Sequence, residues 1–265
     1  MTTTLAEAFA KARSQDRAAL IGYLPAGFPT PAASVELIRA MVSAGVDIVE
    51  VGLPYSDPLM DGPAIQEAVD LALRAGTTTD VVLETVGQVS GTGAATVVMS
   101  YWNPVERYGV ERFADRLADA GGVGVITPDL TPEEARPWVA ATERRGLDRI
   151  FLVAPSSTDQ RIHTVCAATS GFVYAASTMG VTGARAQVSS AAPELVRRTR
   201  AHTSLPIAVG LGVSTGPQAA EVAAYADGVI VGSAFVRRIL DAADQSAAID
   251  AVGELAAELA LGVRG

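Results

Sequence analysis

Short apolar runs alternate along the chain with segments whose apolar residues recur at helical spacing. Several runs are continuously apolar, which is typical of parallel strands that are covered on both faces. A helix-like segment follows each run, and parallel strands need such crossover connections. Eight strands are predicted: Ala19–Leu24, Ile48–Gly52, Thr96–Met99, Gly124–Ile126, Ile150–Val153, Phe172–Ala175, Ile207–Val209 and Val229–Val231.

This repeating order predicts an α/β fold, a (β/α)8 TIM barrel with an extra amphipathic helix at its N-terminus. No linker or composition shift divides the chain, so we expect a single domain over residues 1–265. Capping residues and prolines mark where helices should begin. Such starts are expected at Thr30-Pro31, at Thr131-Pro132 with Glu133 and Glu134 behind it, and at Ser156-Ser157-Thr158-Asp159.

Two strand–helix units are longer than the others, those that follow the strands ending at Gly52 and Ala175. We expect the extra residues to form loops. Because the loops after the strands of a barrel build its binding site, these two insertions should flank the chemistry.

The charge balance limits the possible partners. Twenty basic residues against 29 acidic ones give a net charge of -9. Without a basic run, the chain is not expected to bind nucleic acid or an anionic membrane surface. We find neither a long uncharged apolar stretch nor an apolar leader behind a basic cluster, so a cytoplasmic location is expected.

Residue counts argue against several chemistries. Lys11 is the only lysine and lies in the N-terminal helix, so a Schiff-base mechanism, including pyridoxal-phosphate and lysine-aldolase chemistry, is not expected. His163 and His202 are far apart in the sequence and form no metal-binding motif. Cys166 is the only cysteine, which excludes an internal disulfide and a thiolate cluster. We therefore expect no metal site.

Glycine-rich turns follow the last two predicted strands. They are Gly210-Leu211-Gly212-Val213-Ser214-Thr215-Gly216 and Val231-Gly232-Ser233-Ala234. Glycine lets the backbone approach a ligand closely, and a helix N-terminus presents free N–H groups to an anion. In barrels these two loops frequently bind a phosphate group. The alternative is that the glycines only allow the chain to turn.

Acidic residues gather after the second strand. Glu50 interrupts an apolar strand, where an interior carboxylate must be paired, change its pKa or act in catalysis. Asp57 and Asp61 follow in a loop rich in proline and glycine. A carboxylate cluster at the mouth of the barrel is one interpretation. Glu50 could instead belong to an internal ion pair, and the two aspartates could be turn formers.

The segment after the sixth strand, Ser177–Arg185, consists mostly of small and polar residues and contains two glycines. This composition suits a mobile lid, although an ordinary surface loop would look similar. Tyr23 supplies an aromatic side chain at the end of the first strand.

Over residues 5 to 261 the chain resembles the tryptophan synthase alpha subunit family. The run from Glu50 to Pro63 looks like the family's signature. Further matches are Tyr101-Trp102-Asn103-Pro104, Pro128-Asp129-Leu130, Gly180-Val181-Thr182-Gly183, Gly210-Leu211-Gly212-Val213 and Gly232-Ser233-Ala234. The resemblance implies cleavage of indole-3-glycerol phosphate to indole and glyceraldehyde 3-phosphate without a cofactor. It also implies a pyridoxal-phosphate beta subunit as partner, in an α2β2 complex that passes indole directly between subunits.

The resemblance also implies roles for individual residues. Glu50 matches the general acid/base, and Asp61 matches the carboxylate that faces the indole nitrogen. Matches in the substrate pocket are Tyr23, Tyr174 and Thr182, the last on the lid, together with the phosphate binders Gly183, Gly212, Gly232 and Ser233. Asp57 and Pro58 fall where the family contacts its partner. Met60 is bulkier than the small residue often found beside the aspartate.

The sequence is also compatible with two alternative functions. One is another phosphate-binding barrel, such as a sugar-phosphate isomerase or indole-glycerol-phosphate synthase, although the synthase is expected to need a lysine at a strand end. The other is a non-catalytic barrel retained as an allosteric subunit, against which the presence of Glu50 and Asp61 argues.

Overall fold

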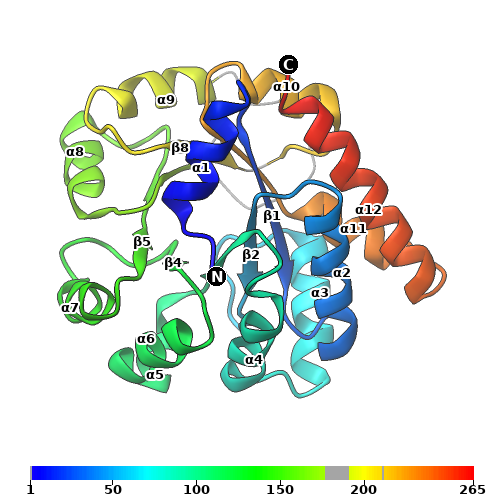
Figure 1. Cartoon of the computed structure of the whole chain (residues 1–265). Helices are drawn as coiled ribbons and strands as arrows, with labels where there is room; N and C mark the ends of the chain where they lie inside the picture. The colour runs from blue at the N-terminus through cyan, green and yellow to red at the C-terminus, as the bar shows by residue number, and fades with distance from the viewer. Residues whose placement is uncertain (1, 177–190, 211) are drawn as a thin grey trace.

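The computed structural model describes residues 2–176, 191–210 and 212–265, and its strands form a parallel barrel (Figure 1). The strand order is β5-β4-β3-β2-β1-β9-β8-β7-β6. The strands are β1 Ala19–Pro25, β2 Ile48–Gly52, β3 Ala95–Met99, β4 Gly124–Ile126, β5 Asp148–Ile150, β6 Leu152–Val153, β7 Val173–Ala176, β8 Ile207–Gly210 and β9 Gly228–Val231. The predicted α/β barrel is confirmed.

The fifth predicted strand is split at Phe151 into β5 and β6. Its first part pairs with β4, where Gly124 lies opposite Asp148, and its second part pairs with β7, where Leu152 lies opposite Tyr174. Because β5 and β6 are consecutive in the chain, this break joins the two ends of the strand order. The eight predicted strands are therefore all present, and the ring closes through the fifth.

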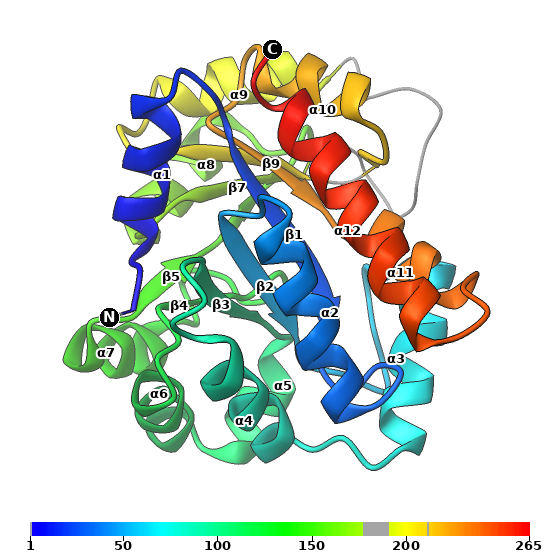
Figure 2. The same cartoon turned by 45° about the vertical axis from the view of Figure 1, so that its right-hand side comes forward.

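Helices surround the barrel, with α1 across one end and the others around the strands. They are α1 Leu5–Ser14, α2 Pro31–Ser43, α3 Pro63–Arg74, α4 Thr79–Val89, α5 Trp102–Tyr108, α6 Val110–Asp119, α7 Arg136–Arg145, α8 Asp159–Ala168, α9 Ala192–Arg200, α10 Gly216–Ala223, α11 Ser233–Leu240 and α12 Gln245–Gly262. Figure 2 shows α2, α12 and α11 side by side on one outer face of the barrel. Apolar residues between these helices and the strands form the larger of two hydrophobic cores.

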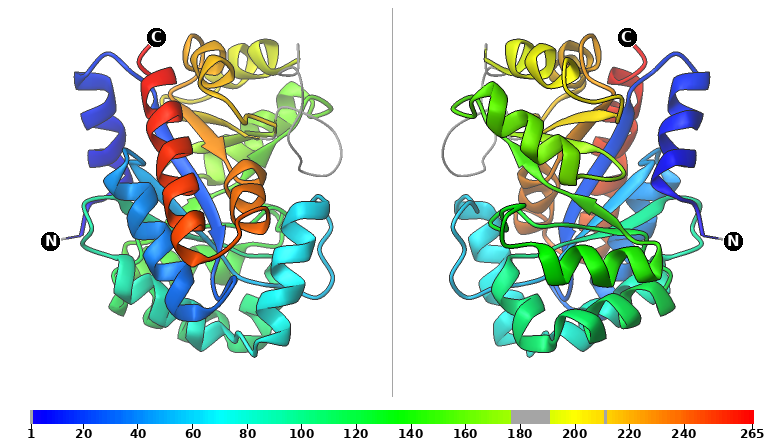
Figure 3. Two further views of the ribbon diagram at one scale, coloured as in Figure 1. Left: turned by 90° about the vertical axis from the view of Figure 1, so that its right-hand side faces the viewer. Right: turned by 90° about the vertical axis from the view of Figure 1, so that its left-hand side faces the viewer.

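The smaller core fills the barrel interior. Ile21, Ile48, Val97 and Ile230 belong to it, and α1 closes it at one end by packing Phe9 against Phe172, with ring centroids 5.6 Å apart. Figure 3 shows α1 at one end of the strands, apart from the outer helices. The predicted N-terminal helix is thus confirmed, and the other end of the barrel is left for a site.

Two of the three predicted helix starts are confirmed. Thr30 caps α2 through its side chain, with proline in the first turn, and Thr158 caps α8. The start at Thr131-Pro132 is wrong, because α7 begins only at Arg136. A helix from Pro132 would place Pro137 in its interior, where its ring clashes with the preceding turn. The chain makes an isolated turn instead, in which the Thr131 carbonyl accepts the Glu134 N–H at 3.1 Å.

The expectation that the extra residues of the second unit form only loops is wrong in part. Between β2 and β3 the chain forms the loop 53–62, then α3, a short connection and α4. Much of the added length is therefore a second helix, and the loop 53–62 is the part at the ends of the strands. The other long insertion, including Ser177–Arg185, lies outside the described residues apart from its flanks.

Candidate active site

A pocket lies at the ends of the strands opposite α1, where β1, β2, β7 and β9 finish. Seven predicted site residues line it together: Tyr23, Glu50, Asp61, Tyr174, Gly212, Gly232 and Ser233. Its apolar lining includes Ile65, Met99 and Ile230, which sequence reasoning missed. Nothing in the sequence separates these three from ordinary core residues, because an apolar pocket wall and an apolar core use the same side chains.

Glu50 is placed in the pocket by the register of the barrel. Side chains alternate along a strand, so Ile48 and Glu50 on β2 point to the same side, and Ile48 belongs to the interior core. Glu50 lies opposite Tyr23 on β1. Glu50 is only 3% exposed, and its Oε2 has no hydrogen-bond partner within the described part of the chain.

Burial determines the acidity of Glu50. Loss of hydration disfavours the carboxylate and raises its pKa to about 8. No neighbouring cation opposes this shift among the described residues, so the alternative of an internal ion pair is not supported there. A glutamic acid with such a pKa is mostly protonated near neutral pH and can exchange its proton with a substrate.

Asp61 reaches the same pocket from the loop 53–62. It is 5% exposed, and its Oδ1 accepts a hydrogen bond from the Tyr101 hydroxyl at 3.2 Å. Its backbone carbonyl accepts the Gln66 side-chain amide at 2.7 Å. Burial raises the pKa of Asp61, while the bond from Tyr101 opposes that rise. The two carboxylates thus have different surroundings, since both are desolvated but Asp61 also accepts a hydrogen bond from Tyr101.

Two buried tyrosines surround Glu50. Burial raises the pKa of Tyr23 and Tyr174 well above the usual value, and the negative charge of Glu50 adds to the shift. Both phenols therefore stay protonated. Tyr23 fits because Gly52 has no side chain, since a Cβ there would lie 2.5 Å from the Tyr23 hydroxyl.

The opposite wall carries the glycines expected to bind phosphate. Gly212 has a φ of 108°, in the region that favours glycine. Gly232 precedes α11 without a side-chain cap, and Ser233 is the first residue of that helix. The first N–H groups of a helix have no partner within the helix, so this wall is suited to an anionic group.

A model of the family described as "Tryptophan synthase alpha chain" matches residues 9–263. This chain belongs to the tryptophan synthase alpha chain family. The tryptophan synthase alpha chain of Thermobifida fusca is 60% identical over 265 residues, covering 99% of this chain and 98% of that protein. That of Nocardia farcinica is 60% identical over 260 residues, covering 98% and 96% respectively. A solved structure of Mycobacterium tuberculosis tryptophan synthase superposes with a TM-score of 0.93 at 54% identity, over 100% of both chains.

Of the remaining residues assigned through this family, Asp57 and Pro58 are described by the structure and do not line the pocket. Asp57 is exposed, accepts the Ser56 hydroxyl at 2.6 Å and lines a separate shallow hollow with Tyr55, Asn103 and Arg107. Pro58 is adjacent and partly exposed. Thr182 and Gly183 lie outside the described residues.

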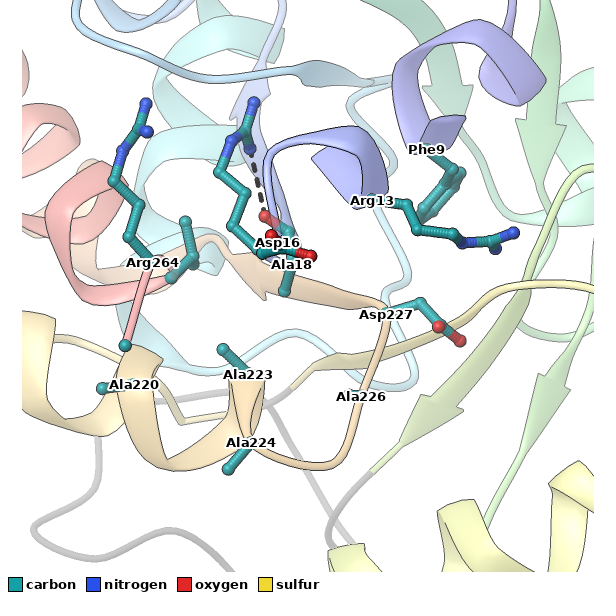
Figure 4. Close-up of a pocket in the computed structure, with 13 residues that line it drawn as sticks. Phe9, Arg13, Asp16, Ala18, Ala220, Ala223, Ala224, Ala226, Asp227 and Arg264 are labelled. Carbon is teal, nitrogen blue, oxygen red and sulfur yellow. Dashed lines mark hydrogen bonds between the residues drawn. The ribbon is translucent and has the colours of Figure 1, made fainter. Parts of the chain in front are cut away.

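A second hollow lies at the other end of the barrel, between α1, α10 and the C-terminal residues (Figure 4). Its carboxylates, Asp16 and Asp227, differ in their surroundings from Glu50 and Asp61. Asp227 is paired with Arg200 at 2.6 Å and also accepts the Ile207 N–H, and Asp16 is exposed. Arg17, which also lines it, is bound to Asp47 at 2.6 Å. Because the carboxylates of this hollow are exposed or paired, the pocket with Glu50 and Asp61 is the better candidate for an active site.

Within residues 2–176, 191–210 and 212–265, no three His, Cys, Asp or Glu side chains come together as a metal site requires. In the same ranges, no helix combines the length and apolar character needed to cross a bilayer.

Proposed function

We propose that this chain is the alpha subunit of a tryptophan synthase and cleaves indole-3-glycerol phosphate to indole and glyceraldehyde 3-phosphate. The observation that supports this most is the pairing of Glu50 and Asp61, two buried carboxylates in different surroundings that face one pocket. The glycine wall at Gly212, Gly232 and Ser233 suits the phosphate of such a substrate.

The proposed reaction begins at Glu50. Its raised pKa allows it to donate a proton to C3 of the indole ring, which places positive charge on the ring nitrogen. The resulting Glu50 carboxylate then takes the proton of the hydroxyl next to C3. That hydroxyl becomes the aldehyde of glyceraldehyde 3-phosphate, the carbon–carbon bond breaks, and its electron pair returns to the ring as indole leaves.

Asp61 is proposed to stabilise the charge at the ring nitrogen. A carboxylate that is already in position interacts with this charge as it develops and needs little reorganisation. The phosphate, held at the far wall, would position the reacting bond without taking part in the chemistry.

A lysine-dependent reaction is not supported. Lys11, the only lysine, is exposed on α1, at the end of the barrel opposite the pocket. The synthase alternative, which is expected to use a lysine at a strand end, is therefore disfavoured. The reaction proposed here also requires no cofactor.

We further propose that the beta subunit binds beside the loop 53–62, in an α2β2 complex. Asp57 and Pro58 lie in this loop, and the next residue, Leu59, is 71% exposed. An apolar side chain this exposed on a loop at the mouth of the pocket is suited to being covered by a partner. We place the reaction in the cytoplasm, where a phosphorylated metabolite is retained.

The test is release of indole from indole-3-glycerol phosphate by the purified chain, with and without a tryptophan synthase beta subunit. We expect indole in both conditions and a higher rate with the partner. Absence of indole in both would overturn the proposed activity and favour a non-catalytic barrel.

A further inference from the structure

The Tyr101 hydroxyl connects the loop 53–62 to the segment that follows β3. It accepts a hydrogen bond from the Met60 backbone N–H at 2.9 Å and lies 3.2 Å from the Asp61 Oδ1. Tyr101 itself is 2% exposed. One phenol oxygen therefore contacts two consecutive residues of the loop, 40 positions away in the sequence.

The direction of both hydrogen bonds follows from their chemistry. A backbone N–H can only donate, so the Met60 bond uses a lone pair of the Tyr101 oxygen and leaves its proton free. An ionised carboxylate can only accept, so that proton points to Asp61. Burial and the charge of Asp61 raise the pKa of Tyr101 well above the usual value, so the phenol keeps this proton.

We propose that Tyr101 is a positioning residue for the reaction, whose hydroxyl holds the Asp61 carboxylate in the orientation needed at the indole ring. This inference rests on the proposed function. Tyr101 acts through Asp61, and the bond to Met60 anchors the backbone immediately before the carboxylate. Asp61 is thereby held through its own side chain and through the backbone N–H of the residue before it.

The same bond favours the charged form of Asp61. Burial alone would push this carboxyl towards its neutral form, which cannot stabilise a positive ring nitrogen. Hydrogen bonding to the carboxylate opposes that effect. Removal of the Tyr101 hydroxyl should therefore raise the pKa of Asp61 and loosen its position.

Tyr101 also has a packing role that the experiment must separate from its hydroxyl. Its ring lies against Tyr55, with centroids 5.5 Å apart. Tyr101→Phe keeps the ring and removes only the hydroxyl. Tyr225→Phe is a matched control, because the Tyr225 hydroxyl is buried, has no partner within the described ranges and does not line the pocket.

The first measurement is the dependence of kcat and kcat/KM on pH, for the wild-type chain with its beta subunit and for both variants. We expect Tyr101→Phe to lower kcat roughly ten- to a hundredfold, as loss of a charge-assisted hydrogen bond does, with a smaller change in KM. The acid limb should move to higher pH, since Asp61 must be ionised to act. Tyr225→Phe should match the wild type. An unchanged kcat with an unmoved acid limb in Tyr101→Phe would overturn the inference.

The second measurement does not depend on activity. The titration of the Asp61 carboxyl is followed by carbon-13 NMR, with Asp61→Asn used to assign its signal. A higher Asp61 pKa in Tyr101→Phe than in the wild type supports the inference, and an identical pKa contradicts it. Failure of the proposed function would show instead as an inactive wild type, so the two failures are distinguishable.

Discussion

Tyr23 and Glu50 lie directly opposite each other on β1 and β2, and both line the pocket. Their neighbours one layer deeper, Ile21 and Ile48, are also paired and belong to the apolar interior. The apolar core of the barrel and the candidate active site are therefore adjacent layers of side chains. Glu50 is close enough to the core to lose its water and close enough to the mouth to reach a substrate.

Replacing Glu50 with glutamine should abolish indole formation. Gln keeps the shape of the side chain but can neither donate nor accept the catalytic proton, and general acid–base groups typically contribute about 10²–10⁴ in rate. Indole release is measured in parallel with binding to the beta subunit, which should be unchanged. Turnover close to that of the wild type would rule out Glu50 as the acid/base.

The stability of the wild type should fall as pH rises through the range set by Glu50. Its pKa is about 8 in the folded chain against an ordinary value of 4.5, so the folded state holds the proton more tightly. Between these values the unfolded state loses its proton first, and the free energy of unfolding from this group decreases with pH. Above about 8 this contribution is constant.

Glu50→Gln tests this linkage, because glutamine does not titrate. Urea unfolding of both proteins near pH 5 and pH 8 should show the variant gaining stability relative to the wild type at the higher pH. A stability difference that is the same at both pH values would mean that Glu50 is not desolvated in the folded chain.

Replacing Asp61 with asparagine should lower kcat by about 10²-fold or more, because the developing charge on the indole nitrogen loses its counter-charge. The exposed Asp250 on α12 provides a control, since Asp250→Asn makes the same change on the outer surface. Steady-state kinetics of the wild type and both variants measures the change in kcat. Equal kcat values for the two variants would mean that Asp61 takes no part in the reaction.

Gly52→Ala should destabilise the protein and disturb the pocket. The new Cβ would lie 2.5 Å from the Tyr23 hydroxyl, so the buried tyrosine must move, at a cost of about 1–3 kcal/mol. Gly253→Ala is the matched control on α12, because nothing lies within 4 Å of its Cβ position. It should stabilise the helix by about 0.5–1 kcal/mol. Thermal unfolding measures both, and the same sign for the two variants would contradict the predicted clash.

Leu59→Asp should weaken binding of the beta subunit by roughly tenfold or more if this side chain is covered at the interface. Leu261 offers a matched control, because it is also 71% exposed but lies on α12. Leu261→Asp should leave the affinity unchanged. Titration calorimetry with the beta subunit compares the two, and equal affinities would remove the loop 53–62 from the proposed interface.

Much of the fold follows from local sequence. Apolar runs, several of them continuous, predict all eight strands, because strands that are covered on both faces bury most of their side chains. The exception at Thr131-Pro132 is also local, since Pro137 excludes the helix that the capping residues suggest. Seven site residues could be named from motifs and resemblance, whereas Ile65, Met99 and Ile230 could not, because apolar pocket walls carry no distinct sequence signal.

The sequence by itself determined the order of the strands and the family, and it singled out the two candidate carboxylates. Only the tertiary structure decided their chemistry. Glu50 loses its water because β1, β2 and β7 enclose it, and Asp61 receives its hydrogen bond from Tyr101, 40 residues later. Periodicity is a property of neighbouring residues, whereas desolvation and hydrogen bonding depend on which distant segments meet, so the acidity of each carboxylate exists only in the folded barrel.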